Sequence, residues 1–212
     1  NDTWMNSPRR DDLGAFMLNY LSSPYSTESP LIILGHPGSG KSLLTTVLAS
    51  QLMSKHFTAI RVPLREVNAD AGIINQIEEA IRRITKTGVD SWAKLSGAFK
   101  NNPPLVILDG YDELLQASGK VFSGYLKDVQ NLQKAEAEQG RPVRVIVTSR
   151  VTLIDKAFIP QGSTIVRLLE FNKTQRDKWI SIWNKANFNY FRDTAIKEFA
   201  LPEEKIIGAE KI

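Results

Sequence analysis

Short apolar runs recur along the chain, and segments with helix-spaced apolar residues lie between them. Most of these runs are apolar on both faces, which is typical of strands in a buried parallel sheet. They predict strands at residues 31–34, 58–62, 105–108, 143–148 and 164–168. The segments between them predict helices at 41–55, 70–86, 91–100, 119–138 and 152–158. This alternation predicts an α/β fold with three layers, α/β/α, in which helices cover both faces of a parallel sheet.

The start of the chain departs from this alternation. Ser7 followed by Pro8 is typical of the cap and first position of a helix, and apolar residues from Leu13 to Leu21 share one stripe. Residues 22–30 are rich in serine and proline and predict a polar linker with few packed side chains.

The end of the chain is helical and contains no further strand pattern. Trp179, Ile182 and Trp183 have the i, i+3, i+4 spacing of one helix face, and a second helix is predicted over 190–200. We therefore expect three parts: an N-terminal helix and linker at 1–30, the α/β core at 31–170 and the start of a helical domain at 171–212. The chain is expected to be a piece of a longer protein.

The turn after the first predicted strand carries the clearest chemistry. Residues 35–42 read Gly-His-Pro-Gly-Ser-Gly-Lys-Ser, which meets every fixed position of the phosphate-binding loop of P-loop nucleotidases. Backbone N–H groups of such a loop and of the following helix attract phosphate, the lysine reaches the β- and γ-phosphates, and the serine hydroxyl binds Mg²⁺. The predicted nucleotide-binding residues are Gly35, His36, Pro37, Gly38, Ser39, Gly40, Lys41, Ser42 and Leu43.

The strand at 105–108 ends in Asp109, the pattern in which a carboxylate holds Mg²⁺ at the ligand edge of an open sheet. Asp109 and Ser42 are therefore the predicted metal residues. Two more acids, Asp112 and Glu113, follow within four positions and can supply the group that orients an attacking water. We expect one of them to act at the γ-phosphate and the other to be a structural acid at a helix start, with Asp112 favoured for catalysis.

Arg150 follows the strand at 143–148 and is the third candidate catalytic residue. An arginine at a neighbouring strand end can contact the γ-phosphate and report its presence. The alternatives are a surface arginine or an ion pair with Asp109 or Asp112.

These three segments together resemble the NACHT module of STAND ATPases, which are multidomain signalling nucleotidases. The resemblance covers residues 31–185, and its specific part is the sequence Asp109-Gly110-Tyr111-Asp112-Glu113-Leu114. It implies an additional-strand sheet like that of AAA+ proteins, with the Arg150 strand between the phosphate-loop strand and the Asp109 strand. It also implies that a small helical domain begins near Glu170.

The resemblance further implies a regulatory ATPase that binds ATP or ADP with Mg²⁺. ADP would hold it closed, and ATP would drive self-association that activates effector and sensor domains in the same longer chain, with defence against phage as the typical setting. The alternatives are a turnover ATPase, such as a motor or loader acting on nucleic acid, and a P-loop kinase. The neighbouring acids Asp112 and Glu113 favour water over a kinase acceptor.

The composition of the chain limits the kinds of partner and compartment that the sequence predicts. The 212 residues carry a net charge of +4 with both signs interspersed, so nucleic acid is not indicated. The chain has no cysteine, no apolar run of membrane-span length and no basic and apolar leader, which together predict a cytoplasmic protein without membrane contact.

Overall fold

The computed structural model of the chain describes residues 7–53, 58–86, 91–99, 102–118, 124–154 and 157–193. These residues form two compact units, Asn1–Leu168 and Leu169–Ile212.

The first unit is built on a five-stranded parallel sheet. Its strands are β1 (Leu31–Gly35), β2 (Ala59–Pro63), β3 (Leu105–Asp109), β4 (Arg144–Arg150) and β5 (Thr164–Arg167). Their order is β2-β3-β4-β1-β5, and all neighbouring pairs are parallel. The insertion of β4 between β1 and β3 confirms the additional-strand sheet that the resemblance implies.

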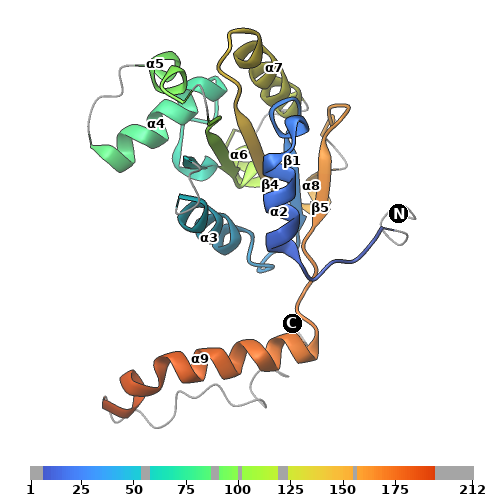
Figure 1. Cartoon of the computed structure of the whole chain (residues 1–212), viewed down its shortest axis with the longest axis vertical. Helices are drawn as coiled ribbons and strands as arrows, with labels where there is room; N and C mark the ends of the chain where they lie inside the picture. Colours follow the sequence, from blue (N-terminus) through green and yellow to red (C-terminus); the bar gives the residue numbers. More distant parts are fainter. Residues whose placement is uncertain are drawn as a thin grey trace. The chain divides into compact units, whose positions relative to one another are not determined.

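Helices cover both faces of this sheet, as the alternation predicts (Figure 1). They are α2 (Leu13–Ser22), α3 (Lys41–Met53), α4 (Ile73–Thr85), α5 (Trp92–Gly97), α6 (Tyr111–Ser118), α7 (Tyr125–Glu138) and α8 (Val151–Ile154). Two 3-10 turns, η1 (Pro24–Thr27) and η2 (Leu64–Glu66), join helices and strands.

Alternate residues of β1 face two separate apolar clusters, because side chains of a strand point to opposite faces of the sheet. Leu31 and Ile33 pack in the cluster that contains α2 and α3 residues. Ile32 and Leu34 pack in the larger cluster with residues of α4, α5, α6 and α7. All four side chains are buried, so β1 is fixed between the two helical layers.

The N-terminal segment differs from its prediction in two respects. The helix begins at Leu13 instead of Pro8, since residues 7–12 are polar and exposed and offer no apolar side chain for packing. Residues 22–30 are not a loose linker, because η1 lies there and Ser26 and Ser29 are buried. The backbone oxygen of Ser26 accepts a hydrogen bond from Gln133 of α7 at 3.1 Å.

The structure also differs from the sequence predictions at two helices in the middle of the chain. The acids after Gly110 lie in the first turn of α6, which begins at Tyr111 and was not among the helices predicted from the alternation. The described part of the helix predicted at 119–138 begins at Tyr125, and residues 119–123 lie outside the described residues.

The second unit contains α9 (Lys173–Asp193), one continuous helix through the residue at which a second helix was expected to begin. Residues 194–212 lie outside the described residues. Within the described ranges, no helix is both long and apolar enough to cross a membrane.

Candidate functional site

The phosphate-loop sequence forms the turn from β1 into α3. Gly38 and Gly40 have φ angles of +77° and +83°, a left-handed conformation that glycine adopts without steric cost. Gly35 leaves room for the loop to close over it, because a Cβ there would lie 2.3 Å from the Ser39 hydroxyl oxygen. The glycines therefore permit a turn that other residues would strain.

Lys41 is fixed beneath this loop. Its ammonium group donates hydrogen bonds to the backbone oxygens of Gly35 and His36, both at 3.0 Å. Since an ammonium has three donors, one N–H remains for a phosphate oxygen. Burial lowers the pKa of Lys41, and the nearby Asp112 carboxylate counteracts part of that effect.

Asp109 ends β3 with its carboxylate almost completely buried. One oxygen, Oδ1, accepts a hydrogen bond from the Thr148 hydroxyl at 2.7 Å. The other, Oδ2, lies 3.2 Å from the Thr45 hydroxyl of α3 and forms an ion pair with Arg61 of β2 at 2.5 Å. Four elements thus meet at this single carboxylate.

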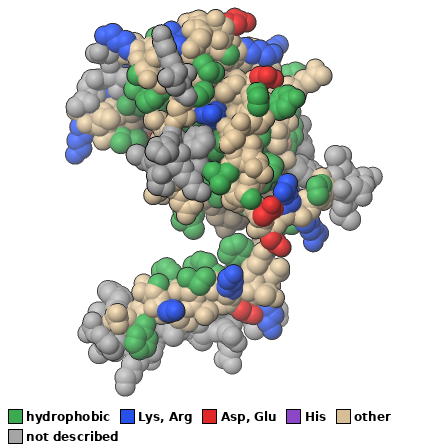
Figure 2. All heavy atoms as spheres, viewed as in Figure 1, with side chains coloured by type: hydrophobic (Ala, Val, Ile, Leu, Met, Phe, Trp, Pro, Cys, Tyr) green, Lys and Arg blue, Asp and Glu red, His purple; other side chains and the backbone are tan. Residues whose placement is uncertain are grey.

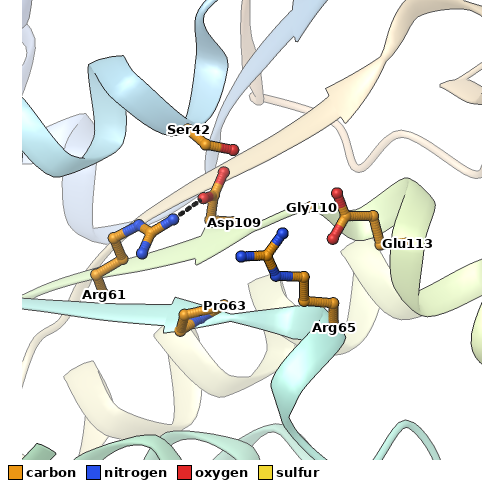
Figure 3. Close-up of a pocket in the computed structure, with 7 residues that line it drawn as sticks. All are labelled: Ser42, Arg61, Pro63, Arg65, Asp109, Gly110 and Glu113. Carbon is orange, nitrogen blue, oxygen red and sulfur yellow. Dashed lines mark hydrogen bonds and ion pairs between the residues drawn. The ribbon is translucent and has the colours of Figure 1, made fainter. Parts of the chain in front are cut away.

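Asp109 and Ser42 line a pocket at the carboxyl ends of the strands, together with Arg61, Pro63, Arg65, Gly110 and Glu113. Figure 3 shows the Ser42 hydroxyl and the Asp109 carboxylate close together, with Arg65 and Glu113 directed toward the same space. This is the ligand edge of an open α/β sheet.

Asp112 and Glu113 have separate surroundings. The Asp112 side chain is 4% exposed and forms an ion pair with Nε of Arg150 at 2.8 Å. Glu113 lies beside Gly110 and lines the pocket. Arg150 itself is opposite Gly35 in the β1–β4 register, so it lies next to the start of the phosphate loop. Of the arrangements considered for Arg150, the structure contains the ion pair with Asp112.

The pocket also contains residues that the sequence did not single out. Arg61, Pro63 and Arg65 come from β2 and η2, where the sequence shows only a short apolar run interrupted by arginine.

His36 of the loop accepts at Nε2 from Arg167 of β5 at 3.0 Å, because a guanidinium can only donate. Leu43, predicted as a binding residue, is 66% exposed.

The Ser42 and Asp109 oxygens of the pocket are of the kind that Mg²⁺ prefers as ligands, and two arginines, Arg61 and Arg65, line the same pocket. Among the described residues, no group of three or more acidic, histidine or cysteine side chains could hold a metal ion by itself. A metal ion held by Ser42 and Asp109 would need phosphate oxygens and water as its other ligands, which is how Mg²⁺ is commonly bound.

Residues 31–172 match the family model of the ATPase family associated with various cellular activities (AAA). No curated protein matches the sequence with significance.

Similar solved structures include AMPPCP-bound DnaA from Aquifex aeolicus, with 16% identity, a TM-score of 0.52 and coverage of 95% of this chain and 57% of that one. Another is the replication initiator DnaA bound to AMPPCP and single-stranded DNA, with 15% identity, a TM-score of 0.50 and coverage of 85% and 52%. At these identities the likeness concerns the fold alone. The chain spans little more than half the length of either structure.

Proposed function

We propose that this chain, which belongs to the ATPase family associated with various cellular activities (AAA), is the nucleotide-operated switch of a larger signalling protein of the NACHT type. Membership of the family makes the chain an ATPase. Its use of nucleotide to switch an assembly, rather than to drive continuous turnover, is our proposal.

The nucleotide of this proposal is ATP or ADP, held by the loop at residues 35–42. The remaining donor of Lys41 and the N–H groups at the start of α3 would bind its phosphates. Ser42 and Asp109 would hold Mg²⁺, which when bound offsets the negative charge of the β- and γ-phosphates.

The observation that supports a switch most directly is the ion pair between Arg150 and Asp112. Arg150 is opposite Gly35 in register and is partly exposed, whereas Asp112 is buried. The γ-phosphate of ATP would compete with Asp112 for the Arg150 guanidinium. ADP has no γ-phosphate and would leave the ion pair intact. A ligand shifts a two-state element only by such a difference in contacts.

Glu113 is the residue that we propose for orienting the attacking water. It faces the pocket that contains Ser42 and Asp109, while Asp112 is occupied by Arg150.

The wider role follows the NACHT resemblance. We propose self-association through the ATPase unit, with sensor and effector domains elsewhere in a longer chain and a role in antiviral or immune defence. The proposed compartment is the cytoplasm, which supplies ATP and Mg²⁺.

Nucleotide binding at the loop is tested with Lys41→Ala. A ligand at a hundredfold excess over its dissociation constant stabilises a protein by about 2.7 kcal/mol, so ATP or ADP should raise the melting temperature of the parent chain. Lys41→Ala should abolish that rise because it removes the ammonium that contacts the phosphates. Lys134→Ala, an exposed position on α7, is the matched control and should keep it. An equal rise in Lys41→Ala would refute the site.

The switch itself is tested on the full-length protein with ATP and with ADP, each in the presence and absence of single-stranded DNA. Mass photometry measures assembly, and phosphate release measures ATP hydrolysis. ATP-dependent assembly without DNA supports the proposal. ATP hydrolysis that requires single-stranded DNA would instead support a loader acting on nucleic acid.

A further inference from the structure

The carboxylate proposed to hold the metal ion is already paired with a cation from this chain. Nη2 of Arg61 lies 2.5 Å from Oδ2 of Asp109, and Nε of Arg61 donates to the Thr45 hydroxyl at 3.1 Å. The Arg61 side chain is 27% exposed and that of Asp109 is 4% exposed. The guanidinium is therefore held by both Asp109 and Thr45. Figure 3 shows its ion pair with Asp109.

This ion pair reduces the negative charge with which the Asp109 carboxylate could bind a metal ion. The positive charge of the Arg61 guanidinium offsets the negative charge of the Asp109 carboxylate. Oδ1 is engaged by Thr148 as well, which gives both oxygens a donor from the protein. A divalent cation brought to the same carboxylate would meet the repulsion of a fixed positive charge.

The position of Arg61 is fixed by the fold. It stands on β2, an edge strand that pairs with β3 so that Arg61 is opposite Ile107 and Pro63 is opposite Asp109. Thr45 lies one turn beyond Ser42 on α3, so the anchor of Arg61 and the proposed metal hydroxyl share one helix.

We infer that Arg61 is a positioning residue that sets the metal dependence of nucleotide binding. This inference rests on the proposed nucleotide site. By supplying the positive charge that Asp109 would otherwise take from Mg²⁺, Arg61 lets ADP bind through Lys41 and the loop with little need of metal. Mg²⁺ then enters chiefly with a triphosphate, whose γ-phosphate adds oxygen ligands.

The test is a titration of Mg²⁺ at fixed ADP and at fixed ATP, with nucleotide affinity followed by fluorescence of a labelled nucleotide. In the parent protein, ADP affinity should change less than about twofold between EDTA and millimolar Mg²⁺. With ATP, Arg61→Gln should lower the Mg²⁺ concentration at the midpoint of the titration about tenfold. This is the effect of removing one unit charge a few ångströms from a divalent ion in a water-like dielectric. Arg61→Lys keeps the charge and should stay within about threefold of the parent.

Arg61→Gln leaves Asp109 buried without its cation, so the fold is checked by circular dichroism. If that variant does not fold, Thr45→Val is tested in its place. It keeps the shape of the side chain and removes the hydroxyl that anchors Arg61, together with the contact of that hydroxyl with Asp109. It should lower the midpoint about threefold.

A folded Arg61→Gln, or in its place Thr45→Val, with an unchanged midpoint would overturn the inference while leaving the nucleotide site intact. Strong metal dependence of ADP binding in the parent would also overturn it. A parent chain that binds no nucleotide would overturn both proposals.

Discussion

Two neighbouring acids, Asp112 and Glu113, have different surroundings because successive residues of a helix point about 100° apart. Asp112 turns to the buried side of α6 and meets Arg150, and Glu113 turns to the pocket. The sequence favoured Asp112 for catalysis and left Glu113 as the alternative. The ion pair leads us to propose the reverse.

Glu113→Gln should therefore abolish ATP hydrolysis and keep ATP binding, because the amide has the shape of the acid but cannot accept a proton. Asp112→Asn should act on stability instead, lowering the free energy of unfolding by about 1–3 kcal/mol through loss of a charged hydrogen bond. Phosphate release and thermal melting of both variants separate the two effects. Full hydrolysis by Glu113→Gln would remove that residue from the mechanism.

Arg150 gives a prediction that distinguishes ATP from ADP. Arg150→Ala should weaken ATP binding about 10–100-fold, the value of a hydrogen bond to a charged group of about 1.5–3 kcal/mol, and ADP binding less than about threefold. Arg150→Lys keeps the charge but not the planar fork, and should lie between. Calorimetric titration with both nucleotides measures the difference. Equal losses for ATP and ADP would make Arg150 a structural partner of Asp112 only.

At the scale of elements, α2 and η1 form part of the core although they precede the phosphate-binding sheet. Met17 and Leu21 are 1% and 0% exposed and pack in the cluster with Leu31, Leu105 and Ile146. The buried serines of the following segment contact α7 and the residues before β5: Gln130 donates to the Ser29 hydroxyl at 2.7 Å and to the Gln161 oxygen at 2.8 Å. The apolar stripe of α2 therefore covers one face of the sheet.

Leu21→Ala should lower the free energy of unfolding by about 2–5 kcal/mol, because it removes buried methyl groups and leaves a cavity. Ile84→Ala is the control, since Ile84 is 68% exposed on α4 and its truncation should change stability by less than about 0.5 kcal/mol. Urea denaturation compares both with the parent. If Leu21→Ala behaved like the control, α2 would have to be detached from the core in solution.

At the scale of the whole molecule, the family match extends from residue 31 to 172 and so continues past the end of the first compact unit at Leu168. The second unit consists mostly of α9 among its described residues. Trp179 and Trp183 stack on each other with ring centroids 5.5 Å apart and remain 44% and 41% exposed. Hydrophobic side chains are visible along α9 in Figure 2.

Several features could be predicted from the sequence because they depend on neighbouring residues. The phosphate loop needs left-handed glycines at fixed positions, and Gly38 and Gly40 adopt that conformation. The strands and helices follow the change between apolar runs and helical spacing, which is set by local geometry. The Asp109 strand end was predictable for the same reason, as an acid that directly follows an apolar run.

The partners of the polar side chains were decided only by the tertiary structure. Arg61 meets Asp109 across 48 residues, and Gln133 meets Ser26 across 107. Such contacts depend on which strands are neighbours and on their register, and a single sequence carries no local signal for either. The sequence by itself therefore determined that this chain has a phosphate loop on a parallel sheet. The tertiary structure decided which charges surround it, because strand order brings Arg61 to the proposed metal carboxylate and Arg150 to Asp112.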